Sequence, residues 1–204
     1  MSIYKEIKII NENKLKTKDI ITIVLMSLIN IFIFGFSSLL YLNPFTILLM
    51  PVYFAITQGI VYFMLGVKVP KKGAFLIYSI IQAIITFNIP YIICYMVAGI
   101  VAEIIMAKIG YGNLKAMTFA YIETQLFNCI GSTIYPYAIT LDATLARMPA
   151  DGGVNSAYIE QAGNMIASWG SLVLMLVTAL CALFGAWLGI KIVKKHLLKN
   201  KATN

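Results

Sequence analysis

Polar side chains recur along one face of the apolar segment 114–140. They are Tyr121, Gln125, Asn128, Ser132 and Tyr135. Their spacing of 4, 3, 4 and 3 residues brings them together on one side of a helix. Amide and hydroxyl groups arranged in this way hydrogen-bond a small molecule, or they hydrogen-bond neighbouring helices.

A ligand pocket is favoured by further polar and aromatic residues in the segment 74–107. Those predicted to line the pocket are Gln82, Asn88, Tyr91 and Tyr95, together with Gln125, Asn128, Ser132 and Tyr135. Most of them fall in the half of their helices that the topology below assigns to the outer side. Convergent polar and aromatic groups of this kind are typical of a binding cavity.

The sequence contains no signature of an enzyme or of a metal site. The one histidine, His196, lies in the basic C-terminal tail, and neither an HExxH motif nor a serine-protease motif occurs. Cys94, Cys129 and Cys181 lie in apolar runs without a CxxC pair. We therefore predict a protein without catalytic residues, metal ligands or an intrinsic cofactor.

Two carboxylates lie within apolar segments, where an ionisable group often marks a functional site. Glu103 is close to the inner end of its segment, so we expect it to reach the membrane interface or a neighbouring lysine. Glu123 lies deeper in its helix and points away from the polar face. An autonomous transporter would couple to protons through Glu123.

Composition and charge indicate a membrane protein. Of 204 residues, 60% are hydrophobic and only 12% are charged, whereas about a quarter of the residues in a soluble domain are charged. Fifteen of the sixteen basic residues fall within 5–18, 68–72, 108–115 and 191–201. Because cytoplasmic loops retain Lys and Arg, each cluster marks the cytoplasmic face, and two crossings separate neighbouring clusters.

We therefore predict an all-α integral membrane protein of the cell membrane, with six transmembrane helices and both termini in the cytoplasm. The predicted spans are 19–41, 44–66, 73–88, 90–108, 114–140 and 169–191. Asn88, Ile89 and Pro90 divide the apolar stretch 74–107 and leave a short third span. As a single helix, this stretch would place the C-terminal lysines outside, against the positive-inside bias.

The segments that flank the spans have distinct expected roles. Residues 1–18 are predicted to form a cytoplasmic amphipathic leader, and residues 192–204 a basic cytoplasmic tail. The outer segment 142–168 is polar and interrupted by proline and glycine, so we expect a loop that covers the pocket as a lid. Its predicted lid residues are Arg147, Asn155 and Tyr158.

The last predicted span carries a face of small residues, formed by Gly185 and Gly189 with Ala182 and Ala186. A GxxxG face lets two helices approach closely. The neighbouring helix belongs either to the same chain or to a partner subunit, and the sequence leaves both possibilities open.

Two short motifs carry a resemblance to a known family. One is Lys14 to Asp19 (KLKTKD), which leads into the first span, and the other is Gly66 to Ala74 (GVKVPKKGA), between spans two and three. With six spans, a short third span and a polar outer segment, the chain resembles the substrate-binding S-component of energy-coupling factor (ECF) transporters. Within these, it is similar to the MptD or Trep_Strep group along essentially its whole length.

The resemblance implies a subunit that binds a micronutrient, such as a vitamin or haem, on the outer side and delivers it by toppling within the membrane. A transmembrane T-subunit and two ATPases would supply the energy, and this chain itself has no phosphate-loop motif. The family's Ala-x-x-x-Ala docking face is absent from the first span. The docking candidates are therefore Ser27, Ile31, Ala98 and Ala102.

Substrate capture for an ECF importer is the leading hypothesis from the sequence. One alternative is an autonomous proton-coupled secondary transporter or channel that uses Glu123. Another is a structural or assembly subunit without a ligand. The expected partners are the T-subunit, the two ATPases, a small-molecule substrate and the lipid bilayer, but no nucleic acid, because the basic residues lie at predicted helix ends.

Overall fold

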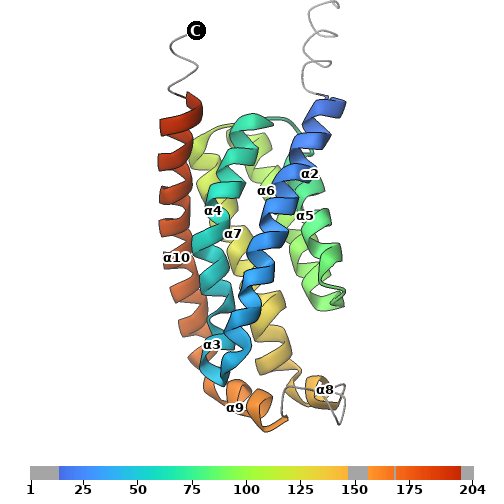
Figure 1. Ribbon diagram of the computed structural model, residues 1–204, viewed down its shortest axis with the longest axis vertical. Coiled ribbons are helices and arrows are strands. Elements are labelled where there is room, and N and C mark those ends of the chain that lie inside the picture. The colour runs from blue at the N-terminus through green and yellow to red at the C-terminus, as the bar shows by residue number, and fades with distance from the viewer. Residues whose placement is uncertain (1–13, 147–155, 168, 199–204) are drawn as a thin grey trace, which may run out of the picture.

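The computed structural model describes residues 14–146, 156–167 and 169–198, and the elements in these ranges are helices (Figure 1). In chain order they are α2 (Thr17–Phe36), η1 (Ser37–Leu42), α3 (Pro44–Leu48), α4 (Met50–Lys68), α5 (Ala74–Ile85), α6 (Ile89–Ile109), α7 (Leu114–Cys129), η2 (Ile130–Ile139), α8 (Leu141–Ala146), α9 (Ser156–Ile166), α10 (Trp169–Val193) and η3 (Lys194–Leu198). Long apolar segments fold as helices in lipid because a helix satisfies its own backbone hydrogen bonds.

Each of the six predicted spans is largely helical, but within the described residues only four helices are both long and apolar enough to cross a membrane. These four are Thr17–Leu42, Met50–Lys68, Ile89–Ile109 and Trp169–Leu197. The predicted third span is the shorter apolar helix α5. The predicted fifth span is one continuous helical stretch made of α7 and the π-helical segment η2.

Asparagine side chains start two of the helices at the predicted breaks. The Oδ1 atom of Asn43 accepts hydrogen bonds from the backbone amides of Phe45 and Thr46, at 3.1 and 2.9 Å. Asn88 caps α6 in the same way by accepting from the Tyr91 amide at 3.4 Å. Since a proline follows each cap at the first or second helical position, both ends combine the two usual helix-start signals.

The third helix, α5, is too short to extend along the whole bundle. Its 12 residues give a length of about 18 Å, against roughly 30 Å for the hydrocarbon core of a bilayer. In Figure 1 the α5–α6 turn therefore lies well short of the end formed by α3, α8 and α9. Within this turn Phe87 has φ 48°, a left-handed conformation that is strained for a bulky side chain.

Helices α4 and α10 pack against each other with their backbones in near contact. A Cβ atom at Gly59 would collide with the Gly185 carbonyl, and one at Gly185 would collide with the Ala55 carbonyl. A Cβ atom at Gly189 would lie 2.6 Å from the Gly59 carbonyl oxygen. The small-residue face of α10 is therefore used within the chain, which decides between the two possibilities that the sequence left open.

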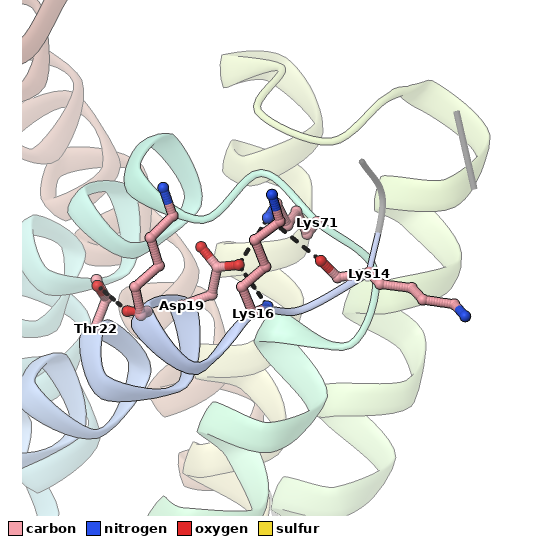
Figure 2. Close-up of polar contacts among 6 residues, drawn as sticks. Lys14, Lys16, Asp19, Thr22 and Lys71 are labelled. Carbon is pink, nitrogen blue, oxygen red and sulfur yellow. Dashed lines mark hydrogen bonds and ion pairs between the residues drawn. The ribbon is translucent and has the colours of Figure 1, made fainter. Parts of the chain in front are cut away.

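At the opposite end from α9, an ion pair joins the start of α2 to the loop between α4 and α5 (Figure 2). The Nζ atom of Lys71 lies 2.7 Å from Oδ2 of Asp19, whose side chain is almost fully buried. The Lys16 amide donates to the same oxygen at 2.8 Å, and Lys71 also donates to the Lys14 carbonyl at 3.3 Å. The start of α2 is therefore held to the loop that leads into α5.

The segment predicted as an outer loop, 142–168, is helical where the structure describes it. It contains most of α8 and all of α9, two helices that were not predicted from the sequence within this outer segment. Helix α9 buries Ile159, Ala162 and Ile166, whose spacing makes one apolar helix face. They pack in one cluster with Ile47 of α3. Arg147 and Asn155 lie outside the described residues.

The α4–α10 contact predicts that Gly185→Ala lowers the stability of the protein by about 1–3 kcal/mol, because the new methyl group forces two backbones apart. Gly35→Ala is the matched control, since a Cβ atom there has nothing within 4 Å, and we expect it to be neutral or slightly stabilising. Thermal unfolding of the purified variants in detergent measures the difference. Equal melting temperatures for the two variants would contradict the close packing.

Candidate functional site

A hollow lies beside the recessed α5–α6 turn. It has a volume of about 320 Å³, and an adjoining space of about 250 Å³ shares most of its lining and adds Ala143 of α8. Together the two spaces form one outer hollow. Its lining residues are Thr86, Phe87, Asn88, Ile89, Pro90, Tyr135, Pro136, Thr140, Ala143 and Thr144.

A second, inner hollow of about 140 Å³ reaches in among α2, α4, α6 and η2. Its lining residues are Phe34, Tyr41, Met50, Phe54, Thr86, Asn88, Tyr91 and Ser132. Thr86 and Asn88 line both hollows. The α5–α6 turn therefore lies where the two hollows meet, and the early end of α5 leaves the space that they occupy.

The wall opposite this turn is the π-helical segment η2. It has ten residues with Pro136 inside it, and π-helical turns are rare and frequently occur at functional sites. A Cβ atom at Gly131 would lie 2.9 Å from the Cβ of Cys94 and 3.1 Å from the Cα of Tyr91. Glycine at position 131 thus lets η2 approach α6 and brings Ser132 close to the turn.

The described residues that line the two hollows include several polar side chains but no charged one. The hydroxyls of Thr86 and Thr144 already donate to backbone carbonyls, at 3.0 and 2.9 Å. By contrast, no described residue hydrogen-bonds the Tyr135 hydroxyl or the side-chain amino group of Asn88. These two groups remain available to hydrogen-bond a bound molecule.

Four of the eight predicted pocket residues line the hollows, and four do not. Asn88, Tyr91, Ser132 and Tyr135 are lining residues. The other four are Gln82, Tyr95, Gln125 and Asn128, which are buried in the helix bundle. The predicted lid residue Tyr158 lies on α9 and lines neither hollow.

The deeper polar residues hydrogen-bond one another across helices. Gln125 of α7 donates to Oε1 of Gln58 on α4 at 3.0 Å, and the Tyr95 hydroxyl of α6 lies 3.5 Å from the same oxygen. Asn128 donates to Oε1 of Gln125 at 3.2 Å. The inner part of the polar face on α7 therefore joins helices, which is the alternative that the sequence offered to a ligand site.

A second polar contact joins α2 to α5. The side-chain amide of Asn30 donates to Oε1 of Gln82 at 2.9 Å, and Gln82 donates to the Ser27 carbonyl at 3.2 Å. Gln82 is thus a structural contact between two helices. Among the described residues, the Oδ1 atoms of Asn30 and Asn128 are buried without a hydrogen-bond partner.

Sequence reasoning missed several residues of this region. Gln58 was missed although an amide within an apolar span is a signal of interhelical bonding. Thr140 and Thr144 were assigned to the end of a span and to a loop, respectively. Their position in the hollow depends on where α8 packs, which the sequence does not indicate.

Three of the four predicted docking residues on α2 and α6 are buried. Ser27, Ala98 and Ala102 are at most 1% exposed and lie inside the bundle. Small residues let helices of the same chain approach as readily as they accept a partner subunit. Ile31 is half-buried and is the one predicted docking residue with an exposed surface.

Glu103 has a structural role that differs from the expected contact with a lysine. Its Oε1 accepts from the backbone amides of Phe75 and Leu76, at 3.0 and 3.3 Å, at the start of α5. A carboxylate stabilises a helix N-terminus in this position. The Tyr111 hydroxyl donates to Oε2 at 2.9 Å, and burial together with this hydrogen bond raises the pKa of Tyr111 to about 12.

The carboxylate of Glu123 makes fewer hydrogen bonds than that of Glu103. Its Oε1 is buried with no hydrogen-bond partner among the described residues, and its Oε2 is 3.5 Å from the Thr124 hydroxyl. The described residues contain no group of three or more His, Cys, Asp or Glu side chains that could hold a metal ion.

The interior network predicts that Gln58→Leu destabilises the protein by about 1–3 kcal/mol, because Gln125 and Tyr95 lose their shared acceptor. The double variant Gln58→Leu with Gln125→Leu should cost less than the sum of the single variants, by about 0.5–2 kcal/mol, since both disrupt one hydrogen bond. Unfolding curves of the wild type and the three variants measure this coupling. Strict additivity would contradict the network.

The model of a family described as a hypothetical bacterial integral membrane protein (Trep_Strep) matches residues 17–199. This range includes all of the described helices. No curated protein and no solved structure matches the chain. The match agrees with the four long apolar helices, which are typical of a multi-pass membrane protein. The chain therefore belongs to the Trep_Strep family of bacterial integral membrane proteins.

Proposed function

We propose that the protein captures a small molecule from outside the cell as the substrate-binding subunit of an ECF-type importer. The observation that carries this proposal is the pair of hollows at the α5–α6 turn, which share Thr86 and Asn88 and have uncharged polar and aromatic side chains among their described lining residues. A concave site with few polar groups is typical of small-molecule binding. The resemblance to S-components supports a micronutrient, such as a vitamin, as the ligand.

The proposal includes a topology of six spans with both termini in the cytoplasm. The start of α2, the α4–α5 loop, the α6–α7 turn and the end of α10 lie at one end of the bundle (Figure 1). These four regions carry the described lysines, so this end is proposed to face the cytoplasm. The hollows, which lie toward the other end, would then face outward.

The energy for import is proposed to come from partner proteins. The sequence contains no phosphate-loop motif, so ATP binding is assigned to two ATPase subunits that act through a transmembrane T-subunit. Because Ser27, Ala98 and Ala102 are buried, the T-subunit would have to contact another, exposed helix surface.

A second candidate function is an autonomous proton-coupled transporter. It is favoured by one observation, the buried Oε1 atom of Glu123, which has no hydrogen-bond partner among the described residues. Transport by the isolated chain in liposomes, driven by a pH gradient and lost in Glu123→Gln, would favour this function over the first. Transport that requires the ATPases and persists in Glu123→Gln would exclude it.

The first test identifies the partners and the ligand. A tagged chain purified from its native membranes should co-purify with a T-subunit and two ATPases, and native mass spectrometry should detect one small molecule bound per chain. Absence of both the partners and the molecule would overturn the proposed function.

The second test concerns the hollow. Tyr135→Phe should weaken ligand retention by about 3- to 10-fold, because one hydrogen bond is lost. Tyr137→Phe is the matched control, since it removes the same group from η2 but does not line either hollow. Equal retention by both variants would place the ligand elsewhere.

A further inference from the structure

Whether lipid or water reaches the hollows depends on their depth in the membrane. The relative lengths of α2 and α5 indicate this depth. The hydrogen bond of Asn30 with Gln82 sets α2 and α5 side by side. Beyond this contact α2 continues to Phe36 and α5 only to Ile85, so α2 extends past α5 by about 5 Å at 1.5 Å per residue, and η1 continues the chain for six more residues. The outer part of α2 therefore has no α5 beside it, and the inner hollow, which Phe34 and Tyr41 line, borders this interval.

The side chains around this interval are large, apolar and exposed. On α2 and η1 they are Phe36, 66% exposed, and Leu39, 64% exposed; at the α5–α6 turn they are Phe87 and Ile89, 88% and 71% exposed. Helix α5 covers about 18 Å of the roughly 30 Å of hydrocarbon, so the turn at its end lies at the depth of the acyl chains. Exposed apolar side chains of this kind are compatible with contact to lipid acyl chains.

The chemistry of the lining limits what the hollows can hold. None of the described lining residues is Lys, Arg, His, Asp or Glu. At acyl-chain depth, a carboxylate or phosphate on a ligand would lose its hydration and find no counter-charge among these residues. Asn88 and Tyr135 offer uncharged hydrogen-bonding groups.

We infer that the occupant of the hollows is an uncharged, lipid-soluble molecule that enters sideways from the outer leaflet, between α2 and the α5–α6 turn. This inference rests on the proposed function, and it narrows the ligand to a neutral compound with hydrogen-bonding groups. The described lining residues offer no counter-charge to an anionic compound such as haem with its carboxylates. The exposed Phe87 stands at the entrance, where an arriving molecule passes it.

The test uses single cysteines and three reagents that share one reactive group. In a variant that lacks Cys94, Cys129 and Cys181, the substitution Ser132→Cys or Tyr135→Cys places one thiol in the hollows. The control is Asp142→Cys on α8, at a position that is exposed and lines neither hollow. Each protein in phosphatidylcholine vesicles reacts with uncharged methyl methanethiosulfonate, with its anionic sulfonatoethyl analogue and with its cationic trimethylammonium-ethyl analogue.

For each cysteine, the reaction rate with the uncharged reagent is divided by the rate with each charged reagent. We expect this ratio to be at least 10-fold higher for the two cysteines in the hollows than for the Asp142→Cys control. Equal ratios at all three positions would overturn the inference, because water and ions would then reach the hollows freely. That result would leave the proposed function standing as capture of a water-soluble molecule. Failure of the proposed function would be seen separately, as the absence of ECF partners and of a bound molecule after purification.

Discussion

The early end of α5 is the constraint on which the candidate site depends. Asn88 starts α6 only three residues after α5 ends, and the proline at position 90 reinforces this start. Helix α5 has 12 residues and covers about 18 Å of the hydrocarbon core of a bilayer, which is about 30 Å thick. Space is therefore left beside η2, and the aromatic and hydroxyl side chains that would otherwise pack on α5 line the two hollows.

Two kinds of contact hold the helices of the bundle together. On one side, Gly59 and Gly185 bring the backbones of α4 and α10 into near contact. On the other side, α2 is held to α5 and its preceding loop by polar contacts at two depths, Asn30 with Gln82 and Asp19 with Lys71. The outer part of α2 lies beyond both contacts, next to the opening of the hollows.

The positions of the long apolar helices were predictable from the sequence, and so was the break at Asn88 and Pro90, because length and local capping determine them. Helices α8 and α9 were not predicted. The division of the polar face of α7 was not predictable. Helical periodicity indicates the direction of a side chain, so it treats Gln125 and Tyr135 alike. Only their depth relative to the end of α5 separates a residue that joins helices from one that lines a hollow. Periodicity also does not show which helix packs against a given face, so it did not predict that Ala98 is buried within the chain.

The central claim is that α5 ends inside the membrane, and the depth of Phe87 tests it most directly. A single tryptophan at position 87, with Trp169 and Trp187 replaced by phenylalanine, reports its surroundings by fluorescence. We predict strong quenching by lipids brominated on the acyl chain and weak quenching by aqueous iodide. Strong quenching by iodide without quenching by the brominated lipids would show that the turn lies in water, and it would contradict the account.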